Sequence, residues 1–171
     1  MTTTGMATKK PDMQPNDVHV IINDFEKMFL GEAKCYSAKG VMQWIIPAIC
    51  KGINGPRFDV WGGDTPPGLY LAGALYQTQG NEPWNTWASY GKWCIDMEEQ
   101  ENQEAKVGRA GICWHGGDPD RTPPLQQMQQ LTETYGCVRS HNRDLEEIVI
   151  PTLRRVRAAD GQMWISVNQL A

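Results

Sequence analysis

The sequence predicts a mainly β fold of the α+β class. Short segments rich in β-branched and aromatic residues recur between turn clusters, and the first of them, Val18–Ile22, has the residue pattern of a half-buried strand. Helical spacing is clear near the end of the chain, where Leu145, Ile148 and Val149 recur at intervals of about one helical turn. Clusters of glycine and proline, which end strands and form turns, separate many of these segments.

The first half of the chain is expected to form a series of strands. The expected strands are Val18–Ile22, Lys34–Lys39, Val41–Ile46 and Leu69–Leu75. Gly40 separates the second of these strands from the third, and the turn clusters Asn54-Gly55-Pro56 and Gly62-Gly63-Asp64 precede the fourth. The fourth strand is expected to lie against the segment around Cys137.

The second half mixes strands with helical segments. Lys92–Met97 and Arg109–His115 are expected to pair around the acidic connector 98–106, which places His115 at the end of its strand. Met163–Val167 is the expected closing strand. Trp84 and Trp87 are assigned to a loop over residues 79–89.

Two helical segments are expected in the same half. The Gln-rich segment Leu125–Leu131 is interpreted as a short lid helix. The later helix, which begins after Cys137, is expected to end near Pro151, because proline lacks an amide hydrogen and clashes with the preceding turn.

Length and composition indicate one compact domain, residues 18–171, after a polar tail, residues 1–17. The net charge of −4 argues against nucleic acid as a partner, and the basic cluster Arg154-Arg155-Arg157 is interpreted as a solvated face. The apolar run Ile45–Cys50 is too short to cross a bilayer, so no membrane span is expected.

The five cysteines do not have the spacing of a disulfide scaffold. Cys113 is expected on a buried strand. Three further cysteines, Cys35, Cys50 and Cys94, are interpreted as small apolar core residues. Cys137 alone has a local sequence suited to chemistry.

That local sequence is Thr134-Tyr135-Gly136-Cys137-Val138-Arg139, and His115-Gly116-Gly117 lies upstream of it. A thiol attacks a carbonyl carbon as a thiolate, and an adjacent imidazole can take its proton near neutral pH. His115 is therefore the candidate base for the candidate nucleophile Cys137. The backbone N–H groups of Tyr135, Gly136 and Cys137 are candidate donors to the oxyanion that the attack would create.

These segments resemble the L,D-transpeptidase (YkuD-like) family. Its motif is His-Gly on a strand, a variable loop, and then Ser or Thr before Gly-Cys-(Ile/Val)-(Arg/Asn), which corresponds here to His115-Gly116 and Thr134–Arg139. The segments Asp64–Tyr70 and His141–Asp144 extend the resemblance to nearly the whole chain. Two departures are Tyr135, where many members have a second His, and a longer loop, Asp118–Thr132, within the 137 − 115 = 22 residue spacing.

The resemblance implies an L,D-transpeptidase-like β-sandwich or mixed sheet with one or two covering helices. It implies an enzyme that cleaves the bond between meso-diaminopimelate and the terminal D-Ala of a peptidoglycan stem tetrapeptide, through a thioester on Cys137. An amine acceptor would give a cross-link and water would give L,D-carboxypeptidase trimming, and the sequence leaves these two outcomes open. Motif-supporting or substrate-orienting roles are implied for Gly116, Thr134, Arg139 and Asn142.

No cofactor and no metal are expected. Cys113 and His115 together with Cys137 and His141 could supply four soft metal ligands, but their spacing is not that of a standard zinc finger. His141 is interpreted as a structural residue. A papain-like or NlpC-like hydrolase is disfavoured because those families place the Cys before the His in the chain.

Residues 1–17 lack the apolar region of a signal peptide, whereas the family acts on the cell wall, outside the cytoplasmic membrane. Either a leader has been removed, or the protein is expected to reach the wall through lysis, a phage virion or a contractile injection machine. A polar tail of this kind is normally disordered, so an ordered tail would point to a large protein assembly. The alternative function is therefore a component of such an assembly, with or without wall-modifying activity.

Overall fold

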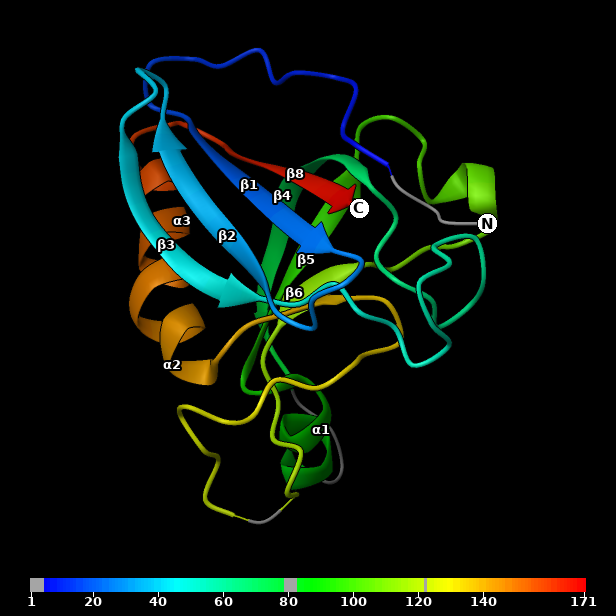
Figure 1. Cartoon of the computed structure of the whole chain (residues 1–171). Helices are drawn as coiled ribbons and strands as arrows, with labels where there is room; N and C mark the ends of the chain where they lie inside the picture. Colours follow the sequence, from blue (N-terminus) through cyan, green and yellow to red (C-terminus); the bar gives the residue numbers. More distant parts are fainter. Residues whose placement is uncertain (1–4, 79–82, 122) are drawn as a thin grey trace.

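A computed structural model describes residues 5–78, 83–121 and 123–171. Eight strands form one mixed sheet in the order β3-β2-β1-β8-β4-β5-β6-β7 (Figure 1), which confirms the mainly β fold class. The strands are β1 Val18–Phe25, β2 Gly31–Ser37, β3 Met42–Ala48, β4 Gly68–Gln77, β5 Trp93–Glu99, β6 Cys113–His115, β7 Val138–Arg139 and β8 Met163–Leu170. The helical segments are α1 Pro83–Tyr90, η1 Ala105–Val107, α2 Asn142–Asp144, η2 Leu145–Val149 and α3 Ile150–Ala158.

The C-terminal strand β8 lies in the middle of the sheet. It pairs parallel with β1, with Val18 opposite Met163, and antiparallel with β4. Residues of β1 alternate between buried and half-buried positions, as the sequence pattern predicts for a strand with one face on the core. The first five expected strands and the last are confirmed, with bounds that differ by a few residues, and β5 pairs with β6 as expected.

Two expectations about strands are wrong. β4 does not lie against the Cys137 segment, because β5 and β6 separate it from β7. The strand expected over Arg109–His115 is limited to Cys113–His115. Before this strand the backbone turns at Gly111, which has φ +75°. Arg109 lies outside the strand, and its side chain donates to the Phe58 carbonyl oxygen at 3.0 Å.

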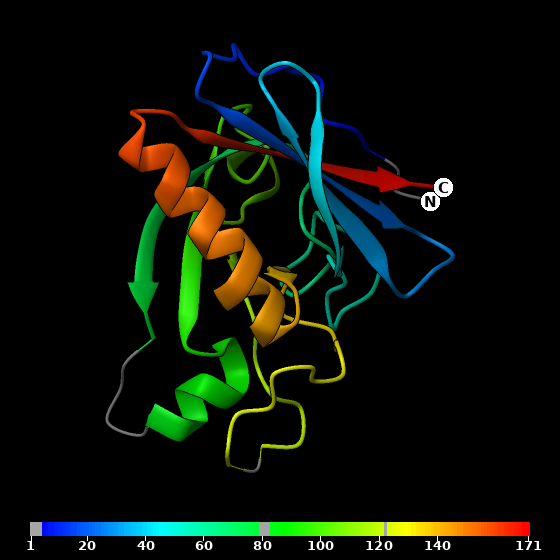
Figure 2. The same ribbon diagram turned by 90° about the vertical axis from the view of Figure 1, so that its left-hand side faces the viewer.

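The helix after Cys137 does not end at Pro151. The segments α2, η2 and α3 follow one another directly, and Figure 2 shows them as one rod across the concave side of the curved sheet. The turn before the proline, Leu145–Val149, is a π-helix, so the hydrogen-bonding pattern changes just ahead of Pro151, whose nitrogen cannot donate. Leu145, Val149 and Leu153 pack into the core beneath the sheet.

Both predictions for the connecting loops are wrong in their secondary structure. Trp84 and Trp87 belong to helix α1, and residues 79–82 of the loop expected there lie outside the described residues. The expected lid helix Leu125–Leu131 is irregular. Its Gln129 side chain is buried and bonds to the backbone of residues 140 and 142, so tertiary contacts fix this segment.

The described part of the tail packs on its own domain. Gly5 forms a bridge with Gln169 of β8, and the amide groups of Thr8 and Lys9 donate to Glu101 Oε1 at 3.1 and 2.7 Å. Contacts within the chain therefore hold the described part of the tail. Among the described residues, no helix is long and apolar enough to span a membrane.

Candidate active site

Parallel pairing of two short strands brings the candidate nucleophile and base together. β6 ends at His115 and β7 begins one residue after Cys137, with Trp114 opposite Val138 and His115 opposite Arg139. The distances among three atoms, the Sγ atoms of Cys113 and Cys137 and a ring nitrogen of His115, are all within 4.8 Å. The register of two strands thus joins residues that are 22 positions apart in the sequence.

The His115 imidazole is buried and held in one orientation. Its Nδ1 lies 2.8 Å from the carbonyl oxygen of Gly116. Because a carbonyl oxygen only accepts hydrogen bonds, Nδ1 carries the hydrogen and Nε2 of a neutral ring is left as the acceptor. The Tyr90 ring packs edge-on against the imidazole, with ring centroids 4.9 Å apart. Sequence reasoning missed Tyr90, because it assigned the preceding residues to a loop.

The Cys137 thiol is set up to ionise. The Cys113 sulfur lies 3.6 Å from it, close enough for its S–H to donate to a thiolate. This contact first, and His115 second, hold the pKa of Cys137 well below the usual thiol range, against the opposing effect of burial. The same contact with Cys137 raises the pKa of Cys113, so Cys113 stays protonated. Cys113 was expected on a buried strand, which is confirmed, but its contact with Cys137 was not anticipated.

The segment before the nucleophile forms a tight, hydrogen-bonded turn. Gly136 N–H donates to Thr134 Oγ1 at 2.9 Å, and that hydroxyl donates to the Cys137 carbonyl oxygen at 2.9 Å. The Gly136 amide, expected as an oxyanion donor, is therefore engaged in this conformation. The Tyr135 and Cys137 amides have no hydrogen-bond partner among the described residues and remain candidate donors.

Glycine is required at position 136. Its φ is +105°, in the region that favours glycine, and a Cβ there would lie 2.6 Å from the Gly63 carbonyl oxygen and even closer to the Arg109 guanidinium. Arg109 also donates to the Tyr135 carbonyl oxygen at 3.3 Å and to that of Asp64 at 2.6 Å. The turn before Cys137 is thus packed tightly against the loop that contains Gly63.

Arg139 ties three segments of the site together. Its side chain is buried, with Nε donating to the Gly116 carbonyl oxygen at 2.9 Å and Nη2 to that of Ser89 at 2.8 Å. Nη1 donates to Thr132 Oγ1 at 2.7 Å. The Gly116 carbonyl oxygen therefore receives hydrogen bonds from both Arg139 and His115. These contacts support a role in orienting the motif, and they leave little of the guanidinium for a substrate carboxylate.

Asn142 fastens the residues after His115 to the start of the helix. Its Oδ1 accepts from Gly117 N–H at 3.0 Å, and its Nδ2 donates to the Gly117 carbonyl oxygen at 2.7 Å. A Cβ at Gly116 would lie only 1.9 Å from Asn142 Oδ1. The second residue of the His-Gly pair is therefore glycine because the Asn142 side chain needs this close approach.

We expect Gly116→Ala to destabilise the fold by about 2 kcal/mol or more, because the added methyl must displace the Asn142 amide. The same substitution in an Asn142→Ala background should cost less, since the clashing atom is gone. A double-mutant cycle from urea unfolding measures this difference, with an expected coupling of about 1–2 kcal/mol. Strictly additive losses of unfolding free energy would contradict the assignment of the clash to Asn142.

The expected lid loop, residues 118–132, is anchored at several points, and Thr122 lies outside the described residues. The buried Asp118 accepts from the amides of Asp120 and Gln126 at 3.0 and 3.1 Å. Figure 1 shows this yellow loop beside α1 at the lower end of the sheet. The loop and α1 together form the wall around His115.

Cys137 is half-buried and borders two pockets. Most residues of the first pocket come from α1, the loop after His115 and the Thr134–Cys137 turn. The pocket is lined by Ile53, Ala88, Ser89, Tyr90, His115, Asp118, Pro119, Arg121, Thr132, Glu133, Thr134, Tyr135, Cys137 and Arg139. The second is lined by Tyr76, Gln77, Thr78, Thr86, Tyr90, Cys94, Gly111, Cys113 and Cys137. Cys137 and Tyr90 belong to both, so the nucleophile can be approached from two sides.

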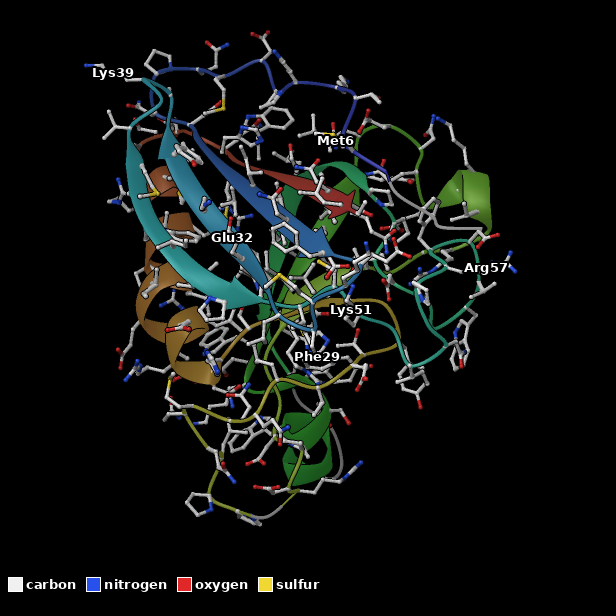
Figure 3. All side chains as sticks on the ribbon, in the orientation of Figure 1. Met6, Phe29, Glu32, Lys39, Lys51 and Arg57 are labelled. Carbon is white, nitrogen blue, oxygen red and sulfur yellow. The ribbon has the colours of Figure 1, made fainter. Side chains whose placement is uncertain are left out.

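A buried ion-pair cluster supports the far wall of the first pocket. Lys51, which Figure 3 shows near the end of β1, donates to Asp24 Oδ2 and to the Phe25 carbonyl oxygen, each at 2.9 Å. The next residue, Gly52, pairs with Thr134 in an isolated bridge, and Thr134 N–H donates to the Lys51 carbonyl oxygen at 3.0 Å. The start of the Cys137 turn is therefore anchored to the sheet.

His141 does not join the Cys113, His115 and Cys137 group. Its Nδ1 lies 3.1 Å from Asp144 Oδ2, at the start of the helix. The four-ligand arrangement considered from the sequence is therefore not formed, and a group of three potential ligands remains.

Comparison with known proteins shows a shared fold. No family model and no curated protein matches the chain. Solved structures that resemble it include the helical cell shape determining protein Pgp2 from Campylobacter jejuni, with 20% identity and a TM-score of 0.52 over 91% of this chain and 49% of that one. Another is Bd1075 from Bdellovibrio bacteriovorus, with 16% identity and a TM-score of 0.51 over 96% of this chain and 51% of that one. The chain spans about half the length of these proteins and has the fold that they share.

Proposed function

We propose that this protein is a cysteine L,D-transpeptidase that acts on peptidoglycan stem tetrapeptides at the cell wall. The observation that carries the proposal is the Cys137–His115 pair, with the imidazole anchored through Nδ1 and the thiol open to a pocket. The resemblance of the Thr134–Arg139 segment to the family motif supplies the substrate class. The fold shared with a cell shape determining protein agrees with a role in the wall.

In the proposed acylation step, His115 Nε2 takes the Cys137 proton and the thiolate attacks the carbonyl carbon at the L-centre of the stem diaminopimelate. The tetrahedral oxyanion lies near the Tyr135 and Cys137 amides, which have no hydrogen-bond partner in the described part of the chain and can donate to it. When the intermediate collapses, the C–N bond breaks and the D-Ala amine takes the proton from His115. A thioester on Cys137 remains.

In the second step, an acceptor enters and His115 takes a proton from it. An amine of another stem gives an amide cross-link, whereas water gives a free tripeptide, and in both cases the Cys137 thiol is released. The second pocket borders the opposite side of Cys137 and offers a route by which an acceptor could reach the thioester. The balance between the two products depends on how well the pocket walls exclude water.

The test is incubation of reduced protein with purified disaccharide-tetrapeptide, followed by mass spectrometry of the muropeptides and of the intact protein. We expect tripeptide or cross-linked dimer, free D-Ala, and an acyl adduct mapped to Cys137. Protein alkylated beforehand at Cys137 is the matched control and should give none of these. A folded, reduced protein that releases no D-Ala and forms no adduct would refute the proposed function.

A further inference from the structure

The ligand atoms of Cys113, His115 and the nucleophile Cys137 have a spacing that suits a metal ion. Zinc binds thiolate sulfur at about 2.3 Å, so two sulfurs of a tetrahedral site are about 3.8 Å apart. The Cys113 and Cys137 sulfurs are 3.6 Å apart. The His115 ring nitrogen is within 4.8 Å of both, and a movement of about 1 Å would bring it to the roughly 3.5 Å spacing that such a site requires.

The surroundings of His115 match those of a metal-bound histidine. A ligating imidazole usually donates its other ring N–H to a carboxylate or a backbone carbonyl, which fixes the tautomer. His115 Nδ1 has such a partner in the Gly116 carbonyl oxygen at 2.8 Å. That carbonyl is itself held by Arg139 Nε at 2.9 Å, so the support extends beyond the first contact.

The site is closed on one side and open on the other. Cys113 and His115 are buried, whereas Cys137 is half-buried and borders both pockets. Three protein ligands with an open fourth position are typical of zinc sites that bind water or a small molecule, whereas closed structural sites have four protein ligands. His141, engaged with Asp144, is not available as the fourth ligand.

We propose that Cys113, His115 and Cys137 form a three-ligand Zn²⁺ site whose fourth position opens into the pocket. Zinc binding displaces the S–H proton of Cys113 to solvent, so both sulfurs bind as thiolates. This inference replaces the sequence-based expectation that the site holds no metal. Thiolate and imidazole together favour zinc over the harder Mg²⁺ and Ca²⁺, which prefer oxygen ligands. If the proposed function holds, bound zinc occupies both the nucleophile and the base, so zinc and acylation of Cys137 exclude each other.

The test measures metal binding to the reduced protein, residues 1–171, by competition with a chromophoric zinc chelator. We expect one Zn²⁺ per chain with a Kd of about 1 μM or tighter. Cys113→Ser and His115→Gln should each weaken binding at least about 100-fold, while His141→Gln, the matched control, should leave the affinity unchanged. Circular dichroism checks that each variant is folded.

Cobalt spectroscopy on the unmodified protein makes the test independent of the variants. Co²⁺ in the site should give a thiolate-to-metal charge-transfer band with the intensity of two sulfur ligands and the visible spectrum of a four-coordinate ion. Absence of binding, a single-thiolate spectrum, or an unchanged affinity in folded Cys113→Ser would overturn the site. A protein that binds zinc in this way but releases no D-Ala when metal-free would refute the proposed function alone.

Discussion

Replacing Cys137 by alanine is expected to abolish D-Ala release, with turnover at least about 10⁴-fold below that of the unmodified protein. The physical reason is that Cys137 lies beside the buried, oriented imidazole and lines the first pocket, whereas the neighbouring Cys113 is buried and its pKa is raised by the contact with Cys137. The side chain is small and half-buried, so the fold should survive. The measurement is D-Ala release from disaccharide-tetrapeptide, alongside thermal unfolding.

The companion variant His115→Gln should lose nearly as much, and the double variant no more than Cys137→Ala alone. Groups that act as one unit in a reaction show this strong non-additivity. Cys35→Ala is the matched control, because Cys35 is a buried thiol on β2, outside the three-residue group. Substantial D-Ala release by folded Cys137→Ala would eliminate the thioester mechanism.

Replacing Arg139 by methionine is expected to lower the free energy of unfolding by about 3 kcal/mol or more, and to reduce activity with it. The side chain is 8% exposed and donates to oxygens of Gly116, Ser89 and Thr132. Methionine fills much of the volume but removes the donor to the partly buried Ser89 and Thr132 oxygens and one of the two donors to the Gly116 carbonyl oxygen. Each group that stays unsatisfied costs about 1–3 kcal/mol. Urea unfolding measures the loss.

Two further variants separate the hydrogen bonds from the charge. Arg139→Lys keeps the positive charge but lacks the planar fork of donors, so it should recover only part of the stability. Arg155→Met should change stability by no more than about 0.5 kcal/mol, because the Arg155 side chain is exposed and bonds to Gln43 Oε1 at the surface. Equal losses for Arg139→Met and Arg155→Met would show that the Arg139 network has little energetic weight.

Local sequence was sufficient for most of the secondary structure. The alternation in Val18–Ile22 and the turn residues around Gly40 depend on neighbouring residues, and the corresponding strands are present. Pro151 and the lid segment were predicted wrongly because their conformations depend on distant contacts. The helix continues past Pro151 by way of the π turn Leu145–Val149, which packs on the core, and Gln129 holds the lid segment through the backbone of residues 140 and 142.

By itself, the sequence determined the mainly β class and singled out Cys137 and His115, because the residues flanking them carry a recognisable motif. Only the tertiary structure decided that the Cys113 sulfur lies 3.6 Å from the Cys137 sulfur and that Tyr90 packs on the imidazole. The physical reason is that these contacts depend on the register of β6 against β7 and on the packing of α1. Both join parts of the chain that are distant in sequence, so no local pattern records them.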